Sequence, residues 1–230
     1  MPLLLSIDTS TATCSVALHQ DGALLGCYEL FTERTSAAML TTLIDDVVRQ
    51  TGHALDQLDA IAVAKGPGSY TGLRIAVSTA KGLCFALDKP LLGLNTLAGM
   101  TEQIRALFPT GTLLCPMIDA RRMEVYCAFY DVTGAEMVPT SAQIIDEKSF
   151  SQWLAQGPVV FFGDGADKCR ALLSQYPNAF FPDLAVVPSA RTIGLLATTA
   201  FAESRFENIA TFEPFYLKDF MTTQPKKAVI

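Results

Sequence analysis

Two stretches of this sequence match each other about half a chain apart, and this internal repeat constrains the fold more than any other feature. The stretch IDTSTATCSVALHQDG begins at Ile7, and the stretch IDARRMEVYCAFYDVTG begins at Ile118, so that Asp8 aligns with Asp119. Such a repeat predicts two copies of one folding unit, each opening with a strand that ends in Asp and returns through a hairpin. Chance similarity between two short strands is the alternative.

The alternation of apolar segments and turn residues predicts nearly the same order of elements in both halves. In the first half, the expected strands cover 3–8, 14–19, 23–31, 60–64 and 91–94, and the expected helices cover 36–50, 73–87 and 96–107. In the second half, the expected strands cover 113–119, 124–131, 136–145 and 159–162, and the expected helices cover 147–155, 167–175 and 190–204. We therefore expect a duplicated α/β fold with two lobes, 1–108 and 109–213, each with a mixed sheet of βββαβα type, followed by a tail, 214–230. Helix 190–204 follows the second half in the sequence, and we consider for it a position packed against the first lobe.

Composition narrows the classes of protein that this chain can belong to. Half of its 230 residues are hydrophobic, which excludes general disorder. Its net charge of −6 argues against a chain that binds nucleic acid by itself, because neutralising phosphates needs basic surface, so any nucleic acid is expected to be contacted only indirectly, through a partner. The chain shows no apolar stretch near the roughly 20 residues of a membrane span and no basic signal-peptide start. Its six cysteines form no CxxC pair, which is typical of reduced, buried cysteines, and we expect a cytoplasmic protein without membrane contact.

Each predicted first hairpin carries an Asp where the first strand ends, and this duplicated arrangement resembles the fold of actin, Hsp70-type ATPases and sugar kinases (ASKHA). In that fold, two such hairpins hold nucleotide phosphates from either side of a cleft. The turns here read Asp8-Thr9-Ser10-Thr11 and Asp119-Ala120-Arg121-Arg122, without the glycine that lets a backbone approach phosphate closely. Both Asp side chains are therefore candidates either for a nucleotide site or for structural hydrogen bonds to turn amides.

Two glycine-rich turns are further candidates for phosphate or nucleotide contact. KGPGSYTG at 65–72 joins a strand to a helix, a context that attracts anions, although a tight turn around Pro67 explains it equally well. FGDGA at 162–166 is the second turn, and an ordinary connection is its alternative. The candidate phosphate-facing residues are Asp8, Ser10, Gly66, Gly68, Ser69, Thr71, Asp119, Arg121, Gly163 and Gly165.

The segment DAIAVAKGPGSYTGLRIAVSTAKGLCFALDKPLLGL closely resembles the Gcp-like family, and LLSIDTSTATCSVAL, IDARRMEVY and PFYLKD fit the same family. The resemblance implies a non-catalytic member that works with its longer catalytic paralogue TsaD and the ATPase TsaE. Together they transfer threonylcarbamoyl to adenosine 37 of tRNAs that read codons starting with A. It also implies a homodimer when the chain is alone, tRNA contacted only indirectly, no cofactor on the isolated chain, and ATP or ADP at the partner interface.

The paralogue's metal is held by an HxxxH pair in the helix after its own GPG turn. The equivalent helix here, LRIAVSTAKGLCFAL, contains no histidine, so we assign no metal ligand and no catalytic residue, and we expect no peptidase activity.

Helices 36–50 and 73–87 carry broader apolar stripes than one sheet face can cover, which favours a partner interface. Packing of both helices in the core is the alternative. The candidate interface residues are Met39, Leu40, Leu43, Ile44, Val47, Leu73, Arg74, Ala76, Val77, Ala80, Lys81, Leu83 and Cys84.

Three other functions remain open at this point. A small-molecule kinase or ATPase of the same fold would bind ATP tightly, a metallopeptidase would need metal ligands, and a homodimeric scaffold would serve another client.

Overall fold

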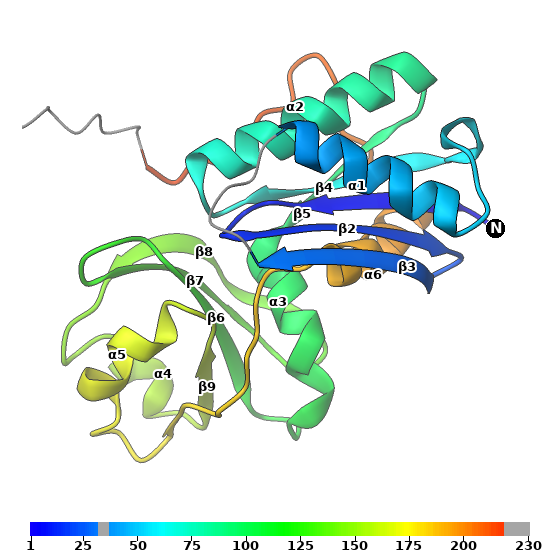
Figure 1. The fold of residues 1–230 in the computed structure, drawn as a ribbon. Coiled ribbons are helices and arrows are strands. Elements are labelled where there is room, and N and C mark those ends of the chain that lie inside the picture. The colour runs from blue at the N-terminus through cyan, green and yellow to red at the C-terminus, as the bar shows by residue number, and fades with distance from the viewer. Residues whose placement is uncertain (32–36, 219–230) are drawn as a thin grey trace, which may run out of the picture.

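The computed structural model describes residues 1–31 and 37–218 and contains two five-stranded sheets with the same strand order. The first sheet has the order β3-β2-β1-β4-β5, and the second has β8-β7-β6-β9-β10. In both sheets the first three strands run antiparallel to one another, and the fourth strand pairs parallel with the first. Figure 1 shows the two sheets as separate lobes with helices around them. The duplicated α/β fold predicted from the repeat is therefore confirmed.

The element bounds follow the predicted order closely. The strands of the first lobe are β1 (Leu3–Asp8), β2 (Thr13–Gln20), β3 (Ala23–Phe31), β4 (Ala60–Gly66) and β5 (Leu91–Asn95). Those of the second lobe are β6 (Leu113–Asp119), β7 (Glu124–Tyr130), β8 (Glu136–Ile144), β9 (Val159–Phe162) and β10 (Ala179–Phe180). The helices are α1 (Ala37–Gln50), α2 (Tyr70–Leu87), α3 (Thr96–Ile104), α4 (Ser151–Leu154), α5 (Ala166–Leu173) and α6 (Ala190–Ala202), with 3-10 turns at Leu55–Gln57 and Arg105–Leu107.

Strand β1 is the centre of the first lobe, and all six of its residues are buried. Helices α1 and α2 cover one face of the sheet, where Leu5 and Ile7 join their core cluster. Helix α6 covers the other face, where Leu4 packs against Ile193 and its neighbours. A strand covered on both faces needs apolar residues at successive positions, which is why LLLSI shows little alternation.

The two lobes exchange their last helices. Helix α3 follows β5 in the chain but buries Leu97 and Met100 in a cluster with the second sheet. Helix α6 follows the second sheet but packs on the first, and its Ala190 N–H donates to Ser15 Oγ at 2.9 Å. The predicted boundary at residue 108 therefore places α3 in a lobe whose sheet buries little of it. Because each sheet depends on a helix from the other half, the lobes share their cores.

Two predicted helices differ from the structure, and one strand was not predicted. The helix expected at 147–155 is a single turn, α4, because Phe150 adopts a positive φ of 62° and Ser149 Oγ hydrogen-bonds Asp146 before it. Strand β10 was not predicted, since two residues carry no periodicity. Helix α2 begins at Tyr70 instead of residue 73, because the Ser69 side chain accepts the Gly72 N–H and caps it there. The predicted helix start at Ser36 and the last part of the tail, 219–230, lie outside the described residues.

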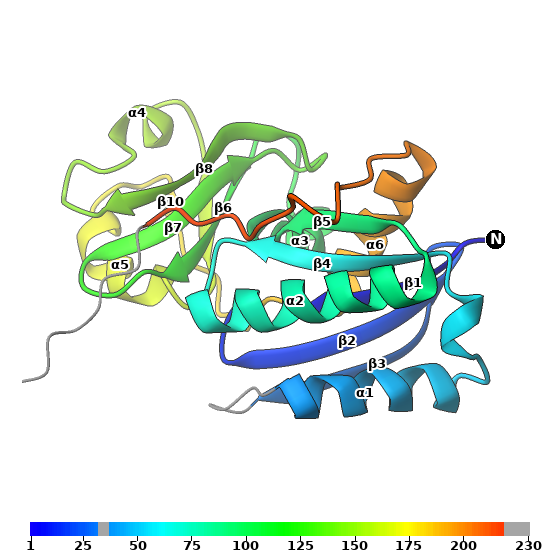
Figure 2. The same cartoon turned by 90° about the horizontal axis from the view of Figure 1, so that it is seen from above.

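The C-terminal segment, residues 206–218, crosses from the first lobe to the second (Figure 2). It begins beside β5, where Glu207 N donates to Leu91 O at 2.8 Å. It then passes β4, where Phe215 N donates to Lys65 O at 2.7 Å. Among the described residues, no helix is long and apolar enough to span a membrane.

Candidate functional site

The turn after β1 carries the first candidate carboxylate, Asp8, which is almost completely buried. Its Oδ1 accepts hydrogen bonds from Ser10 N at 2.8 Å and from Ser10 Oγ at 2.6 Å. Its Oδ2 is buried and has no hydrogen-bond partner in the described structure. Burial raises the pKa of Asp8 to about 6, and the Ser10 hydrogen bonds limit that rise.

The glycine-rich turn between β4 and α2 lies directly against this first turn. A Cβ on Gly68 would lie 2.1 Å from Ser10 O, and a Cβ on Gly72 would lie 2.0 Å from Thr9 O. Two hydrogen bonds join the turns, from Ser69 N to Ser10 O at 2.6 Å and from Thr9 Oγ1 to Gly72 O at 2.7 Å. The glycines are therefore required for contact between two segments of backbone.

This packing corrects the phosphate-site prediction for the first lobe. Asp8 and Ser10 are buried, and the Ser10 carbonyl occupies the space beside Gly68. Gly66 is covered by the C-terminal segment, since its Cβ would lie 3.0 Å from Phe215 O. Only Ser69 and Thr71 among the first-lobe candidates are exposed. The residues of this turn do not fit a nucleotide phosphate in this structure.

The second lobe repeats the arrangement with different residues. The turn between β9 and α5 approaches the end of β6, where a Cβ on Gly163 would lie 2.4 Å from Met117 O. A Cβ on Gly165 would lie 2.9 Å from the carbonyl carbon of Ile118. FGDGA therefore occupies the position in the second lobe that KGPGS occupies in the first, and its glycines serve the same close approach.

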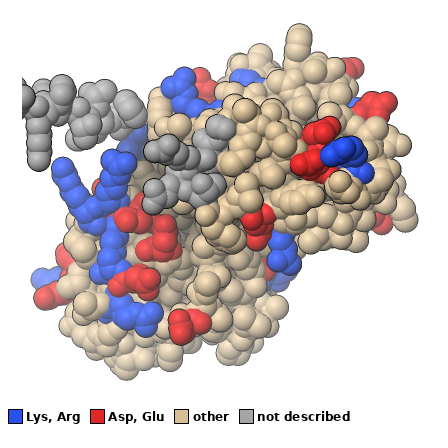
Figure 3. Space-filling view, viewed as in Figure 1, with Lys and Arg blue, Asp and Glu red and all other residues tan. Residues whose placement is uncertain are grey.

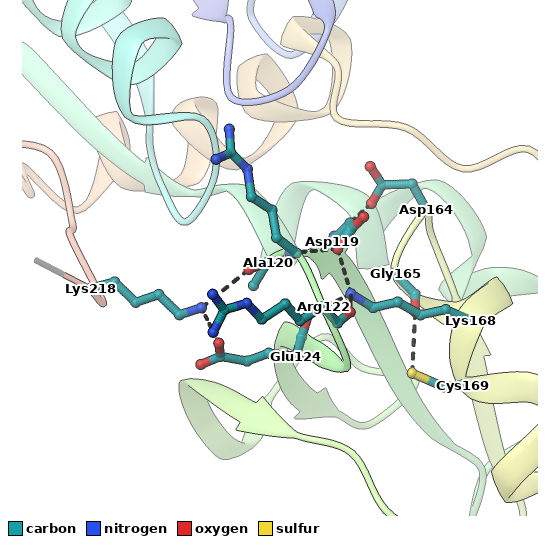
Figure 4. A network of polar contacts seen from close by, with 10 residues as sticks. Asp119, Ala120, Arg122, Glu124, Asp164, Gly165, Lys168, Cys169 and Lys218 are labelled. Carbon is teal, nitrogen blue, oxygen red and sulfur yellow. Dashed lines mark hydrogen bonds and ion pairs between the residues drawn. The ribbon is translucent and has the colours of Figure 1, made fainter. Parts of the chain in front are cut away.

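Beside this turn, Lys168 of α5 holds the β6–β7 hairpin together (Figure 4). Its ammonium forms an ion pair with Asp119 and donates to the carbonyl oxygens of Arg122 and Glu124 at 2.7 Å each. Asp164 Oδ1 in turn accepts from Asp119 N at 3.0 Å. Partial burial tends to raise the pKa of Asp119, but hydrogen bonds from Lys168 and from the Arg121 N–H outweigh it, and the net shift is downward. Asp119 is thus a structural carboxylate in a polar network.

Lys218, near the end of the described chain, joins the same hairpin from the other side. It forms an ion pair with Glu124, donates to Ala120 O at 3.2 Å and lies 5.6 Å from the centre of the Tyr126 ring. The C-terminal segment is thereby tied to both lobes, because Lys81 of α2 also donates to Phe212 O at 3.0 Å.

Most of the predicted interface residues on α1 and α2 are buried in the chain's own core. The eight buried ones are Leu40, Ile44, Val47, Leu73, Ala76, Val77, Ala80 and Cys84. This part of the interface prediction is corrected, because side chains that pack between helix and sheet are not available to a partner. Met39, Leu43, Lys81 and Leu83 are half-buried, and Arg74 is exposed, with its guanidinium donating to Tyr70 Oη at 3.1 Å.

The exposed stripe of α2 carries one large apolar residue that sequence reasoning missed. Phe85 is 82% exposed and follows Ser78 and Gly82 along the outer face of the helix. Helical spacing places it opposite the buried stripe, so a Phe on the outward face was the available signal. Between α2 and the C-terminal segment runs an open groove of about 400 Å³, lined by Arg74, Ser78, Lys81 and Tyr216 among others.

Three comparisons with known proteins cover most of the chain. A family model described as TsaD, tRNA N6-adenosine threonylcarbamoyltransferase, matches residues 30–224. The tRNA threonylcarbamoyladenosine biosynthesis protein TsaB of Escherichia coli (strain K12) is 30% identical over 221 residues, which cover 94% of each chain. The chain belongs to the TsaB family. YeaZ from Pseudomonas aeruginosa is 31% identical in sequence, and its structure covers 94% of this chain and 100% of its own, with a TM-score of 0.78.

A more distant structure shares the fold alone with this member of the TsaB family. The activator of the 2-hydroxyisocaproyl-CoA dehydratase from Clostridium difficile, solved with bound ADPNP, has a TM-score of 0.51 and 10% sequence identity. Within the described ranges of the present chain, no group of three His, Cys, Asp or Glu side chains is arranged to hold a metal ion.

We predict that Gly72→Ala destabilises the protein by on the order of 1–3 kcal/mol, because the new methyl group would overlap the Thr9 carbonyl. Gly82→Ala is the matched control in the same helix, since nothing lies within 4 Å of its Cβ position. We expect that control to raise stability by up to about 1 kcal/mol through helix propensity. Urea unfolding measures both changes. Equal effects of the two substitutions would contradict the proposed contact between the turns.

The buried carboxyl of Asp8 predicts a pH dependence of stability. Its pKa of about 6 in the folded state lies above the value of 3.8 for a free Asp, so the folded protein binds more protons between these values. Stability contributed by this group is therefore full below about pH 4 and is lost as the pH rises through 6, by on the order of 3 kcal/mol at most. Asp8→Asn keeps a neutral acceptor for Ser10 and removes this dependence.

The free energy of unfolding is measured between pH 4 and 7 for the wild type, for Asp8→Asn and for a control variant, Asp56→Asn. The stability of Asp8→Asn relative to wild type should increase with pH, whereas the control Asp56→Asn, at an exposed position, should follow the wild type. A constant difference between Asp8→Asn and wild type would mean that Asp8 is ionised in the folded protein across this range.

Proposed function

We propose that this chain acts in tRNA threonylcarbamoyladenosine biosynthesis as a non-catalytic cytoplasmic subunit. In this proposal it binds and stabilises the catalytic paralogue TsaD, together with the ATPase TsaE. The complex then transfers threonylcarbamoyl to adenosine 37 of tRNAs that read codons starting with A. Membership of the TsaB family, with 94% coverage of both chains in the Escherichia coli match, supports the pathway.

The outer face of α1 and α2 is the observation that carries the subunit role. The two helices lie side by side on one face of the first sheet (Figures 1 and 2). They leave Phe85 exposed, with Leu83 and Met39 half-buried. Figure 3 shows mostly uncharged surface along this edge of the first lobe. Aromatic residues are enriched in protein interfaces relative to the rest of the protein surface.

The residues of α2 also explain why we assign the chemistry to the paralogue. The Gcp-like resemblance places an HxxxH pair in the equivalent helix of the catalytic member, whereas α2 contains no histidine. The turn that precedes α2 is filled by backbone from the β1–β2 turn. A nucleotide in the working complex would thus need groups from the partner, which fits the proposed place for ATP or ADP at the interface. A homodimer formed through the same helices would compete with the paralogue for them.

The first test is an omission assay for tRNA modification. The catalytic paralogue, the ATPase, a source of threonylcarbamoyl-adenylate and substrate tRNA are combined with and without this chain, and modified adenosine is quantified. We expect modification to collapse without the chain and to return when it is added. Undiminished modification in its absence would refute the subunit role and would favour a homodimeric scaffold with another client.

We further predict that Phe85→Glu weakens binding to the catalytic paralogue by about tenfold or more, because the proposed interface would bury a carboxylate in place of an aromatic ring. Titration calorimetry of the purified pair measures the affinity. Phe180→Glu is the control, since Phe180 is also exposed but lies on β10 of the second lobe. Unchanged affinity for Phe85→Glu, with the fold intact, would remove α2 from the proposed interface.

A further inference from the structure

The β6–β7 hairpin turn places two arginines in a backbone conformation that arginine rarely adopts. Arg121 has a φ of 67° and Arg122 has a φ of 52°, both in the left-handed region that favours glycine and asparagine. Both side chains are exposed. Packing does not require an arginine at either position, so the residue type at this turn needs another explanation.

The acidic neighbours of this turn each have a cation of their own. Lys168 pairs with Asp119, and Lys218 pairs with Glu124. Within the part of the chain that the structure describes, neither guanidinium of the arginine pair has a hydrogen bond or an ion pair. The two lysines thus form the direct ion pairs with these carboxylates, and the guanidinium of Arg121 attracts Asp119 only at longer range.

The charge of the molecule is unevenly distributed around this hairpin. Lys and Arg side chains lie along one side of the second lobe in Figure 3, interspersed with Asp and Glu side chains. In Figure 4, Arg122 lies beside Lys218 and Glu124 at the edge of the hairpin. The hairpin surface thus carries the cations Arg121, Arg122, Lys168 and Lys218 beside the carboxylates Asp119, Glu124 and Asp164, within a chain whose net charge is −6.

We propose that Arg121 and Arg122 bind phosphate groups of the RNA backbone. A guanidinium presents a planar fork of N–H donors that matches phosphate oxygens, and arginine keeps its charge at every physiological pH. This inference rests on the proposed function, and it replaces the expectation that tRNA meets this chain only through a partner.

The phosphates of a free nucleotide offer the same chemistry, but the geometry favours RNA. Both arginines stand on an exposed turn, and the two grooves beside the C-terminal segment are lined by other residues. A small phosphate ligand needs an enclosing pocket for useful affinity. A polyanion gains affinity from several exposed contacts at once, through release of its counterions.

The test uses the double variant Arg121→Asn/Arg122→Gly, which removes both charges and supplies residues suited to positive φ. Its melting temperature should equal or exceed that of the wild type, so lost binding cannot be ascribed to unfolding. Arg205→Gln is the matched control, because Arg205 is an exposed arginine paired with Glu203, outside the second lobe. Filter binding of a tRNA transcript that reads a codon starting with A is measured at several salt concentrations, with the chain alone and in complex with the paralogue.

We expect the double variant to bind this tRNA about tenfold more weakly at 0.1 M salt, and the slope of log K against log salt to fall by about one to two. The control should match the wild type in both. Unchanged affinity and slope in the double variant would overturn the proposal. Competition by millimolar ATP that removes the arginine-dependent part of tRNA binding would overturn it in favour of a nucleotide site.

A failure of this RNA-binding proposal can be distinguished from a failure of the proposed function. Affinity for the paralogue should be the same for the double variant and the wild type, and the variant should support modification at saturating tRNA while its KM for tRNA rises. If the chain proved dispensable in the omission assay, the binding measurements on the chain alone would still report on the arginines.

Discussion

The contact between two backbone turns in the first lobe determines where most of the other elements lie. The turn after β1 and the turn before α2 touch without intervening side chains, because Gly68 and Gly72 have no Cβ to separate them. This contact sets the start of α2, and α2 in turn sets the path of the C-terminal segment through Lys81. The same contact recurs in the second lobe through Gly163 and Gly165, so the duplication extends to the detail of how strands meet helices.

That contact also bears on the glycine-rich turns as candidate phosphate sites. Glycines in a strand-to-helix turn are compatible with two functions, since they allow either a phosphate or another backbone to approach. Here the backbone of Thr9 and Ser10 occupies the approach. In the second lobe, Lys168 and Lys218 bind the hairpin carbonyls and carboxylates. In each lobe, groups of the chain itself therefore contact the turn that a phosphate would have to approach.

The fold could be predicted from the sequence far better than the site. The repeat around Asp8 and Asp119 predicted the order of strands, because hairpins and their buried strands leave a local pattern. Helical spacing places Leu73 and Ala80 on one face of α2 and Phe85 on the opposite face, but it does not show which of these faces packs against the chain's own sheet. An apolar stripe wider than one face leaves that choice open. Lys81 and Lys218 donate hydrogen bonds to residues far from them in the sequence. Local sequence patterns do not reveal such contacts.

The exchange of α3 and α6 has a consequence for the order in which the protein acquires its structure. One face of the first sheet remains uncovered until Ala190–Ala202 has been synthesised, because no earlier helix packs in that place. The first lobe therefore cannot complete its core while the ribosome is still translating the second. Its strands form early, but their contacts with α6 close a loop of well over a hundred residues, and such contacts form late in folding. The growing chain must keep the apolar residues of that face, such as Leu4 and Leu92, from aggregating during this interval.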